Sequence, residues 1–178
     1  MIGIGFSIAA FRGDRRGVSA IEFALLAPVL IAFYFGMSEM AQAFMAQKRM
    51  GHVAATVGDL AAQDDTLTTV EVNNIFAAGQ TIMHPYSTDD LTLRLSSVTV
   101  DSAGVAHIDW SRGSGMSPRA TGSTVTLPSG LAAPGESLIF SEVAFEYYSP
   151  VEAFLPGITS FERSYYLRPR TVEKVLLA

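Results

Sequence analysis

The chain has 178 residues, a formal net charge of −5 and no cysteine. This length suits one modest domain with an anchor rather than two full domains. Without cysteine, disulfides, thiol nucleophiles and cysteine-ligated metal centres are excluded. The acidic balance argues against a nucleic-acid partner, which would need a basic face. Only 16% of the residues are charged and 49% are hydrophobic, an imbalance that a membrane segment would explain.

Basic residues gather at the N-terminus. Residues 1–17 contain Arg12, Arg15 and Arg16 against one acid, Asp14, whereas acidic residues outnumber basic ones from residue 38 onward. The most apolar stretch of the chain separates these two regions. We therefore expect a basic leader at 1–17, and the positive-inside rule places it in the cytoplasm.

Residues 18–38 are predicted to be a transmembrane helix. They include an uncharged run from Phe23 to Met37, and Glu22 is their single charged residue. A helix of this length spans about 31 Å, close to the thickness of a bilayer's hydrocarbon core. Pro28 lies inside the run, which a membrane helix tolerates. Residues 39–178 are then expected to form an extracytoplasmic domain.

A cleavable secretory signal is the main alternative for this region. A basic segment, an apolar segment and then Ala41-Gln42-Ala43 have the required order. Glu22 at the start of the apolar run and Glu39 close to the supposed cleavage site weigh against it. A buried helix of a soluble protein is disfavoured because the run is apolar on every face.

The heptapeptide Gly17-Val18-Ser19-Ala20-Ile21-Glu22-Phe23 stands at the edge of the apolar run. It resembles a type IV prepilin processing site, where a membrane peptidase cuts after the glycine. The cut bond here would be Gly17–Val18. A carboxylate inside a membrane helix is costly, so Glu22 is expected to be retained for a partner. The resemblance implies that this partner is the free N-terminal amine of a neighbouring subunit.

The longer segment from Arg15 to Leu30 follows the pattern R-R-G-x-x-x-x-E-F-A-x-x-x-P-x-L. This segment resembles the TadE-like family of the tight adherence (Tad/Flp) pilus system. The resemblance implies a membrane-anchored pseudopilin or minor pilin-like component that is not an enzyme. Gly17 and Val18 would be the processing site, and Glu22 and Phe23 would serve subunit assembly.

The same resemblance implies partners, a location and a lack of cofactors. The partners would be other pilus or pseudopilin subunits, the Tad assembly machinery and a prepilin peptidase. The protein would cross the bacterial inner membrane once, with its N-terminus in the cytoplasm and its C-terminal domain in the periplasm. No catalytic residue, metal or cofactor is expected.

Beyond the anchor, apolar stripes at helical spacing predict that the helix continues to about residue 62, allowing for a break near Gly51 or Gly58. Asp64-Asp65-Thr66 is typical of a turn. A second helix is predicted over 69–83, because Thr68 or Thr69 with Glu71 forms a start signal and Pro85 a stop.

The remainder is predicted to be strands. Residues 91–100 alternate with period two, apart from a shift at Ser96-Ser97, and 105–110 return as a hairpin. An exposed loop is expected over 111–137, with a short strand at 124–127. Two longer strands are expected at 138–148 and 158–167, separated by an excursion at 150–156. The predicted fold class is α+β, a small mainly antiparallel sheet packed on the long helix in a pilin-like layout.

Sites for chemistry are not indicated. His52, His84 and His107 fall on different elements, and a metal site needs converging ligands. Asp109-x-Ser111-x-Gly113 lacks the second serine of an adhesive metal site. Two function classes therefore stay open: a pilus assembly component, and a secreted binding or adhesion module released by signal peptidase. The N-terminus of the mature protein would separate them.

Overall fold

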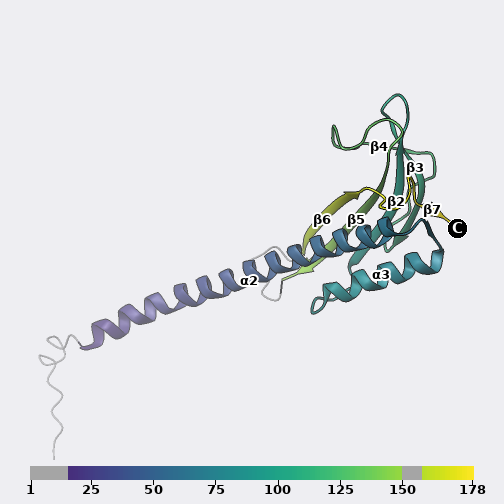
Figure 1. The fold of residues 1–178 in the computed structure, drawn as a ribbon. Helices are drawn as coiled ribbons and strands as arrows, with labels where there is room; N and C mark the ends of the chain where they lie inside the picture. Colours follow the sequence, from purple (N-terminus) through teal and green to yellow (C-terminus); the bar gives the residue numbers. More distant parts are fainter. Residues whose placement is uncertain (1–15, 150–157) are drawn as a thin grey trace, which may run out of the picture.

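The structure, a computed structural model, describes residues 16–149 and 158–178 (Figure 1). Most of the basic leader and the whole excursion at 150–156 lie outside these residues. The described part consists of one long helix, α2 (Arg16–Gln63), which carries a sheet and a second helix at its C-terminal end. The predicted α+β layout is confirmed.

Helix α2 runs without interruption through both halves predicted for it. Its 48 residues span about 72 Å at the rise of an α-helix. The helix continues through Pro28 and through both glycines at which a break was allowed, so no break occurs. At Gly58 the missing side chain serves packing instead, because an added Cβ would overlap Leu167 and press on Ser141.

Helix α3 (Thr69–Met83) has the predicted bounds. Thr68 is its N-cap and forms a capping box with Glu71, in which the backbone N–H of Thr68 donates to Glu71 Oε2 at 2.7 Å. This arrangement satisfies amide donors that the first turn would otherwise leave unpaired. Val72, Ile75, Phe76, Gly79 and Met83 form the buried face of α3, which packs against α2.

The main sheet has five strands in the order β4-β3-β2-β5-β6. Its strands are β2 (Leu91–Val100), β3 (Ala106–Ser114), β4 (Thr124–Val125), β5 (Ser137–Tyr148) and β6 (Ile158–Leu167). All pairs are antiparallel. Strand β3 extends beyond the predicted hairpin return, and β4 is shorter than predicted.

A register shift between Ser97 and Val98 divides the core. Before it, Leu91, Leu93 and Leu95 pack with α2 and α3 in the larger cluster. After it, Val98 and Val100 belong to a second cluster with Ile108 and Phe140. Successive residues of β2 point to opposite faces, so β2 reaches both clusters while it keeps one register with β5. The extra residue is Asp109 in β3, and this bulge puts Ile108 in the second cluster and Trp110 in the larger one.

The C-terminal segment returns to the end of α2. A short parallel pair joins β1 (Thr66–Leu67) to β7 (Leu176–Leu177), so the predicted turn at 64–66 is wrong for Thr66. The backbone N–H of Arg170 donates to Ala62 O at 2.9 Å. The indole N–H of Trp110 donates to Val175 O at 2.8 Å. We call the compact part formed by residues 46–149 and 158–178 the head.

Candidate membrane anchor and assembly surfaces

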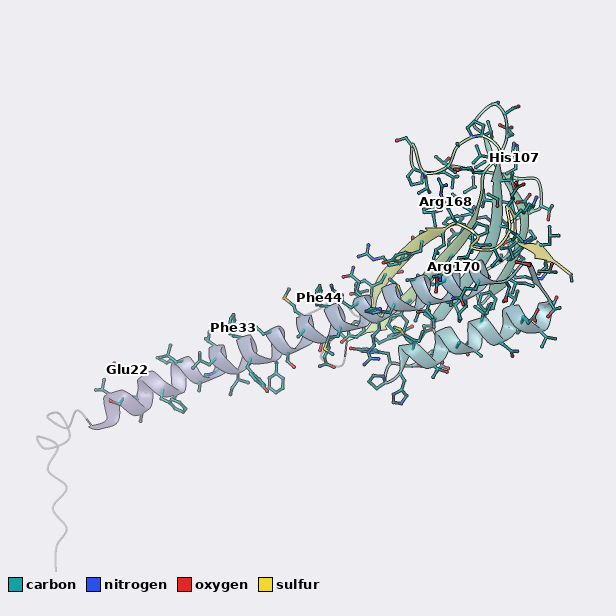
Figure 2. The ribbon with its side chains drawn as sticks, in the orientation of Figure 1. Glu22, Phe33, Phe44, His107, Arg168 and Arg170 are labelled. Carbon is teal, nitrogen blue, oxygen red and sulfur yellow. The ribbon has the colours of Figure 1, made fainter. Side chains whose placement is uncertain are left out.

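The N-terminal half of α2 projects away from the head (Figure 2). Its large apolar side chains are exposed, with Phe23 at 70% of its full accessible surface. The other exposed members are Val18, Ile21, Leu25, Leu26, Val29, Leu30, Ile31, Phe33, Tyr34, Phe35, Met37, Met40, Phe44 and Met45. Water does not favour such a surface. By length and composition α2 can cross a membrane, so the free half is compatible with a membrane anchor.

Gly17 and Val18 lie in the first turn of α2. A Cβ at Gly17 would meet nothing within 4 Å, so no packing contact requires glycine there. The first amide N–H groups of a helix lack intrahelical acceptors, and the first turn therefore opens more easily than later turns. Opening would present the Gly17–Val18 bond as extended chain.

Glu22 and Phe23 are both exposed on the free half of α2, and Figure 2 shows Glu22 near the N-terminal end of this helix. Glu22 is four residues from Val18, which puts both on one face of the helix. Within residues 16–149 and 158–178, no side chain forms a hydrogen bond or an ion pair with Glu22. The structure thus leaves Glu22 and Phe23 available to another molecule and brings neither to the head.

Glu39 forms a buried hydrogen bond with Tyr147 that the sequence does not predict. It is 1% exposed at the point where α2 meets the head, and Tyr147 Oη donates to Glu39 Oε1 at 3.0 Å. Burial, followed by this hydrogen bond, raises the pKa of Tyr147 to about 12. The phenol therefore stays protonated and donates at neutral pH. A signal was present, because Glu39 is the only charged residue between Phe23 and Gln47.

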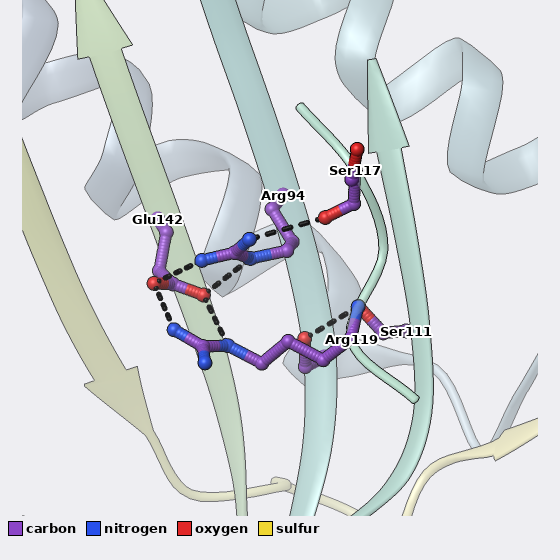
Figure 3. A network of polar contacts seen from close by, with 6 residues as sticks. Arg94, Ser111, Ser117, Arg119 and Glu142 are labelled. Atoms are coloured by element: carbon purple, nitrogen blue, oxygen red, sulfur yellow. Dashed lines mark hydrogen bonds and ion pairs between the residues drawn. The ribbon is translucent and has the colours of Figure 1, made fainter. Parts of the chain in front are cut away.

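A charge cluster lies on the sheet face opposite the helices (Figure 3). The Glu142 carboxylate accepts from Arg94 Nε and Nη2, both at 2.7 Å, and from Arg119 Nε and Nη2 at 3.0 and 2.7 Å. Arg94 also donates to Ser117 O at 3.1 Å. Burial works to raise the pKa of Glu142, but the hydrogen bonds from both arginines outweigh it and hold this pKa below its ordinary value. The cluster ties the loop after β3 to the sheet.

The three histidines, for which no metal site is predicted, lie in separate parts of the fold. His107 Nε2 lies 3.0 Å from Asp101 Oδ2. This hydrogen bond and one with Gly122 O raise the pKa of His107. Asp109, in the incomplete adhesive-site pattern, pairs with Lys174 and accepts from Thr99 Oγ1 at 2.6 Å. In the part of the chain that the structure describes, no three His, Asp or Glu side chains converge as metal ligands.

The fold is an α+β head on one long helix whose free half is apolar and exposed, and this agrees with the predicted pilin-like layout. Residues 17–59 match the model of a protein family described as TadE-like protein. This match confirms the predicted resemblance, and it covers the free half of α2 and most of its packed half. No curated protein and no solved structure matches the chain at a significant level.

The family match implies involvement in Tad pilus assembly. That role agrees with the anchor, since the matched segment contains the exposed apolar helix and the motif with Gly17 and Glu22. It also implies contact with pilus components.

Proposed function

We propose that the protein is a pseudopilin or minor pilin-like component of Tad (Flp) pilus assembly. Residues 18–38 span the bacterial inner membrane, the leader at 1–17 stays in the cytoplasm, and residues 39–178 lie in the periplasm. The observation that carries the proposal is the continuity of α2, which is exposed and apolar where the family match begins and buried where it joins the head.

The continuity of α2 also favours retention of the anchor over release by signal peptidase. A cut near Ala43 would remove Glu39 and leave the buried hydroxyl of Tyr147 without its acceptor. An unpaired buried polar group costs about 1–3 kcal/mol. Because the buried core around Tyr147 uses Glu39, the residue directly after the predicted membrane segment, a cut near Ala43 would remove part of the head's own structure.

Glu22 is proposed to pair with the N-terminal amine of a neighbouring subunit. Replacement of Glu22 by alanine should leave the protein in the membrane fraction, since removing a carboxylate makes insertion easier. We expect far fewer pili, because the neighbour's amine then has no counter-charge in a medium of low dielectric constant. Electron microscopy of surface fibres, with immunoblots of membrane fractions, measures both effects.

Asp64→Ala provides the control, because Asp64 is exposed and its side chain forms no hydrogen bond or ion pair with the described residues. This variant should form pili normally. A normal number of pili in Glu22→Ala would contradict the pairing role.

The Gly17–Val18 bond is proposed to be cut by a prepilin peptidase. We expect Gly17→Leu to remain uncut, because the side chain obstructs a protease cleft that accepts glycine backbone. The fold should be unchanged, since the space around Gly17 is open. Mass spectrometry of the purified protein measures the result: wild type should begin at Val18, and the variant at its original N-terminus.

A wild-type chain beginning near residue 44 would instead establish the secreted module. An intact wild-type N-terminus would refute cleavage and leave the anchor.

A further inference from the structure

A groove of about 630 Å³ runs beside the packed half of α2. Strand β6 forms its other wall, and the lining residues are Phe44, Gln47, Lys48, Gly51, His52, Ala55, Arg163 and Tyr165. The lining contains two cations and a histidine but no carboxylate. We call it the basic groove.

Two charges in the basic groove have no hydrogen-bond acceptor. In residues 17–149 and 158–178, every other Lys or Arg side chain donates to a carboxylate or a carbonyl. Lys48 has only an aromatic contact, with Nζ 5.3 Å from the centre of the Phe44 ring. Arg163 is exposed, and its side chain forms no hydrogen bond or ion pair with the residues that the structure describes. The other cations are paired within the fold, whereas Lys48 and Arg163, both in the basic groove, remain available to an anion of another molecule.

On the opposite flank of α2, acidic residues have no cationic partner among the described residues. The loop after α3, residues 86–90, contains Asp89 and Asp90, and Glu146 lies beside it because its N–H donates to Asp90 O at 3.4 Å. The charges of Asp90 and, less strongly, Glu146 raise the pKa of exposed Tyr148. Figure 1 shows α3 on one side of α2 and β6 on the other. Because the acidic loop follows α3 and β6 forms a wall of the basic groove, the two surfaces belong to opposite sides of α2.

These two surfaces lie at nearly the same level along α2. Tyr86 Oη donates to Gln42 O at 3.1 Å, which fixes the acidic loop near Gln42. The basic groove begins at Phe44 and ends at Ala55. The offset from Gln42 to Lys48 is six residues, about 9 Å along the helix.

We propose that the basic groove binds the acidic loop at 86–90 of a second copy of this chain. Copies anchored in one membrane have parallel α2 helices, so the acidic loop of one copy can meet the basic groove of the next. The two surfaces differ, which makes the contact head-to-tail, and the offset along α2 prevents closure into a dimer. Such a contact repeats as an open helical array.

The proposal rests on the proposed function, since it needs both copies in one membrane. The direction of the offset matches the pairing proposed for Glu22. If Gln42 of one copy lies level with residues 46–48 of the next, Val18 of the first lies near residues 22–24 of the second. The head contact and the contact at the membrane edge therefore require the same sense of stagger.

Cysteine cross-linking tests the contact, because the full chain has no cysteine of its own. Gln47→Cys places a thiol in the basic groove and Ser87→Cys places one in the acidic loop. Oxidation of membranes that contain the double variant should give a ladder of multimers, since disulfides form only between close Cα atoms. Each single variant alone should stay monomeric, and a mixture of the two single variants should stop at dimers.

A matched pair, Gln47→Cys with Ser102→Cys, should give no ladder, because Ser102 lies in the exposed turn between β2 and β3. Adding Lys48→Glu and Arg163→Glu to the Gln47/Ser87 pair should reduce the ladder at least about fivefold, since like charges then face each other. Further replacement of Asp89 and Asp90 by lysine should restore it. Circular dichroism checks that each variant is folded.

Dimers from either single variant, or no ladder from the Gln47/Ser87 pair, would overturn the proposal. If the basic groove binds an anionic lipid headgroup instead, the Gln47/Ser87 pair would give no ladder. Pilus counts in the same strains separate the two hypotheses. If pili are normal and require this protein, but the Gln47/Ser87 pair gives no ladder, only the contact between heads is overturned. Pili that are unaffected by deletion of the protein overturn the proposed function.

Discussion

Replacement of Glu142 by alanine is expected to destabilise the head by about 2–4 kcal/mol. The Glu142 side chain is 13% exposed and receives both guanidinium groups of the cluster in Figure 3. Its removal leaves Arg94 and Arg119 close together without a counter-charge. It also removes the ion pair that joins Arg119, in the loop after β3, to β5. Thermal or denaturant unfolding of the full chain in detergent, followed by circular dichroism, measures the loss.

The stabilisation from Glu142 should depend on pH with a definite sign. Its pKa is lower in the folded protein than its ordinary value of 4.5, so the folded state favours the ionised form. The contribution is complete above the unfolded value and disappears as the pH falls through the folded value. Wild type should lose stability on acidification below about pH 4.5, and Glu142→Ala should lose less.

Arg168→Ala is the matched control for Glu142→Ala. Arg168 pairs with Glu136 at 2.8 Å, but its side chain is 62% exposed. Exposed pairs contribute about 0–1 kcal/mol. Equal losses of stability in the two variants would show that the cluster contributes no more than a surface pair.

Substitution of Gly79 is expected to separate α3 from α2. A Cβ at Gly79 would lie 2.8 Å from Val57 Cγ2 and 3.2 Å from Val53 Cγ1, and β-branched valines in a helix have one preferred rotamer and yield little. Overpacking costs about 1–3 kcal/mol and should exceed the gain of about 1 kcal/mol in helix propensity. Gly79→Leu should cost about 3 kcal/mol or more.

Gly51→Ala makes the corresponding change in α2 where the space is open, with nothing within 4 Å of an added Cβ. This variant should gain about 0.5–1 kcal/mol from helix propensity alone. The same unfolding experiment compares Gly79→Ala with Gly51→Ala. A gain in stability at Gly79 as well as at Gly51 would mean that the two helices can move apart without loss.

Much of the fold follows from local sequence patterns. The apolar stripes after Met37 predict the continuation of α2, and Thr68 with Glu71 predicts the start of α3 because a capping box is a local motif. The alternation over 91–100 predicts β2, and its interruption at Ser96-Ser97 marks where the apolar residues of β2 change from one face of the sheet to the other. These signals depend on neighbours along the chain, so one sequence suffices to detect them.

Other features depend on residues far apart in sequence. No break occurs in α2 at Gly58, where Leu167 and Ser141 leave no room for a side chain. Helix propensity does not include such a tertiary contact. Strands β1 and β7 are too short for a periodic pattern and join residues about 110 positions apart. The bond between Glu39 and Tyr147 likewise needs the tertiary fold. The predicted processing and assembly residues, Gly17, Val18, Glu22 and Phe23, stay predictions.

The uninterrupted α2 has a mechanical consequence. Its packed half is held by the sheet and by α3, and no hinge separates it from the free half. A change of tilt in the free half must therefore move the whole head with it. Conversely, a load applied to the head is transmitted along α2 to its N-terminal end and is not absorbed by a flexible linker. In the proposed membrane-anchored role, such a load would act directly on the membrane segment.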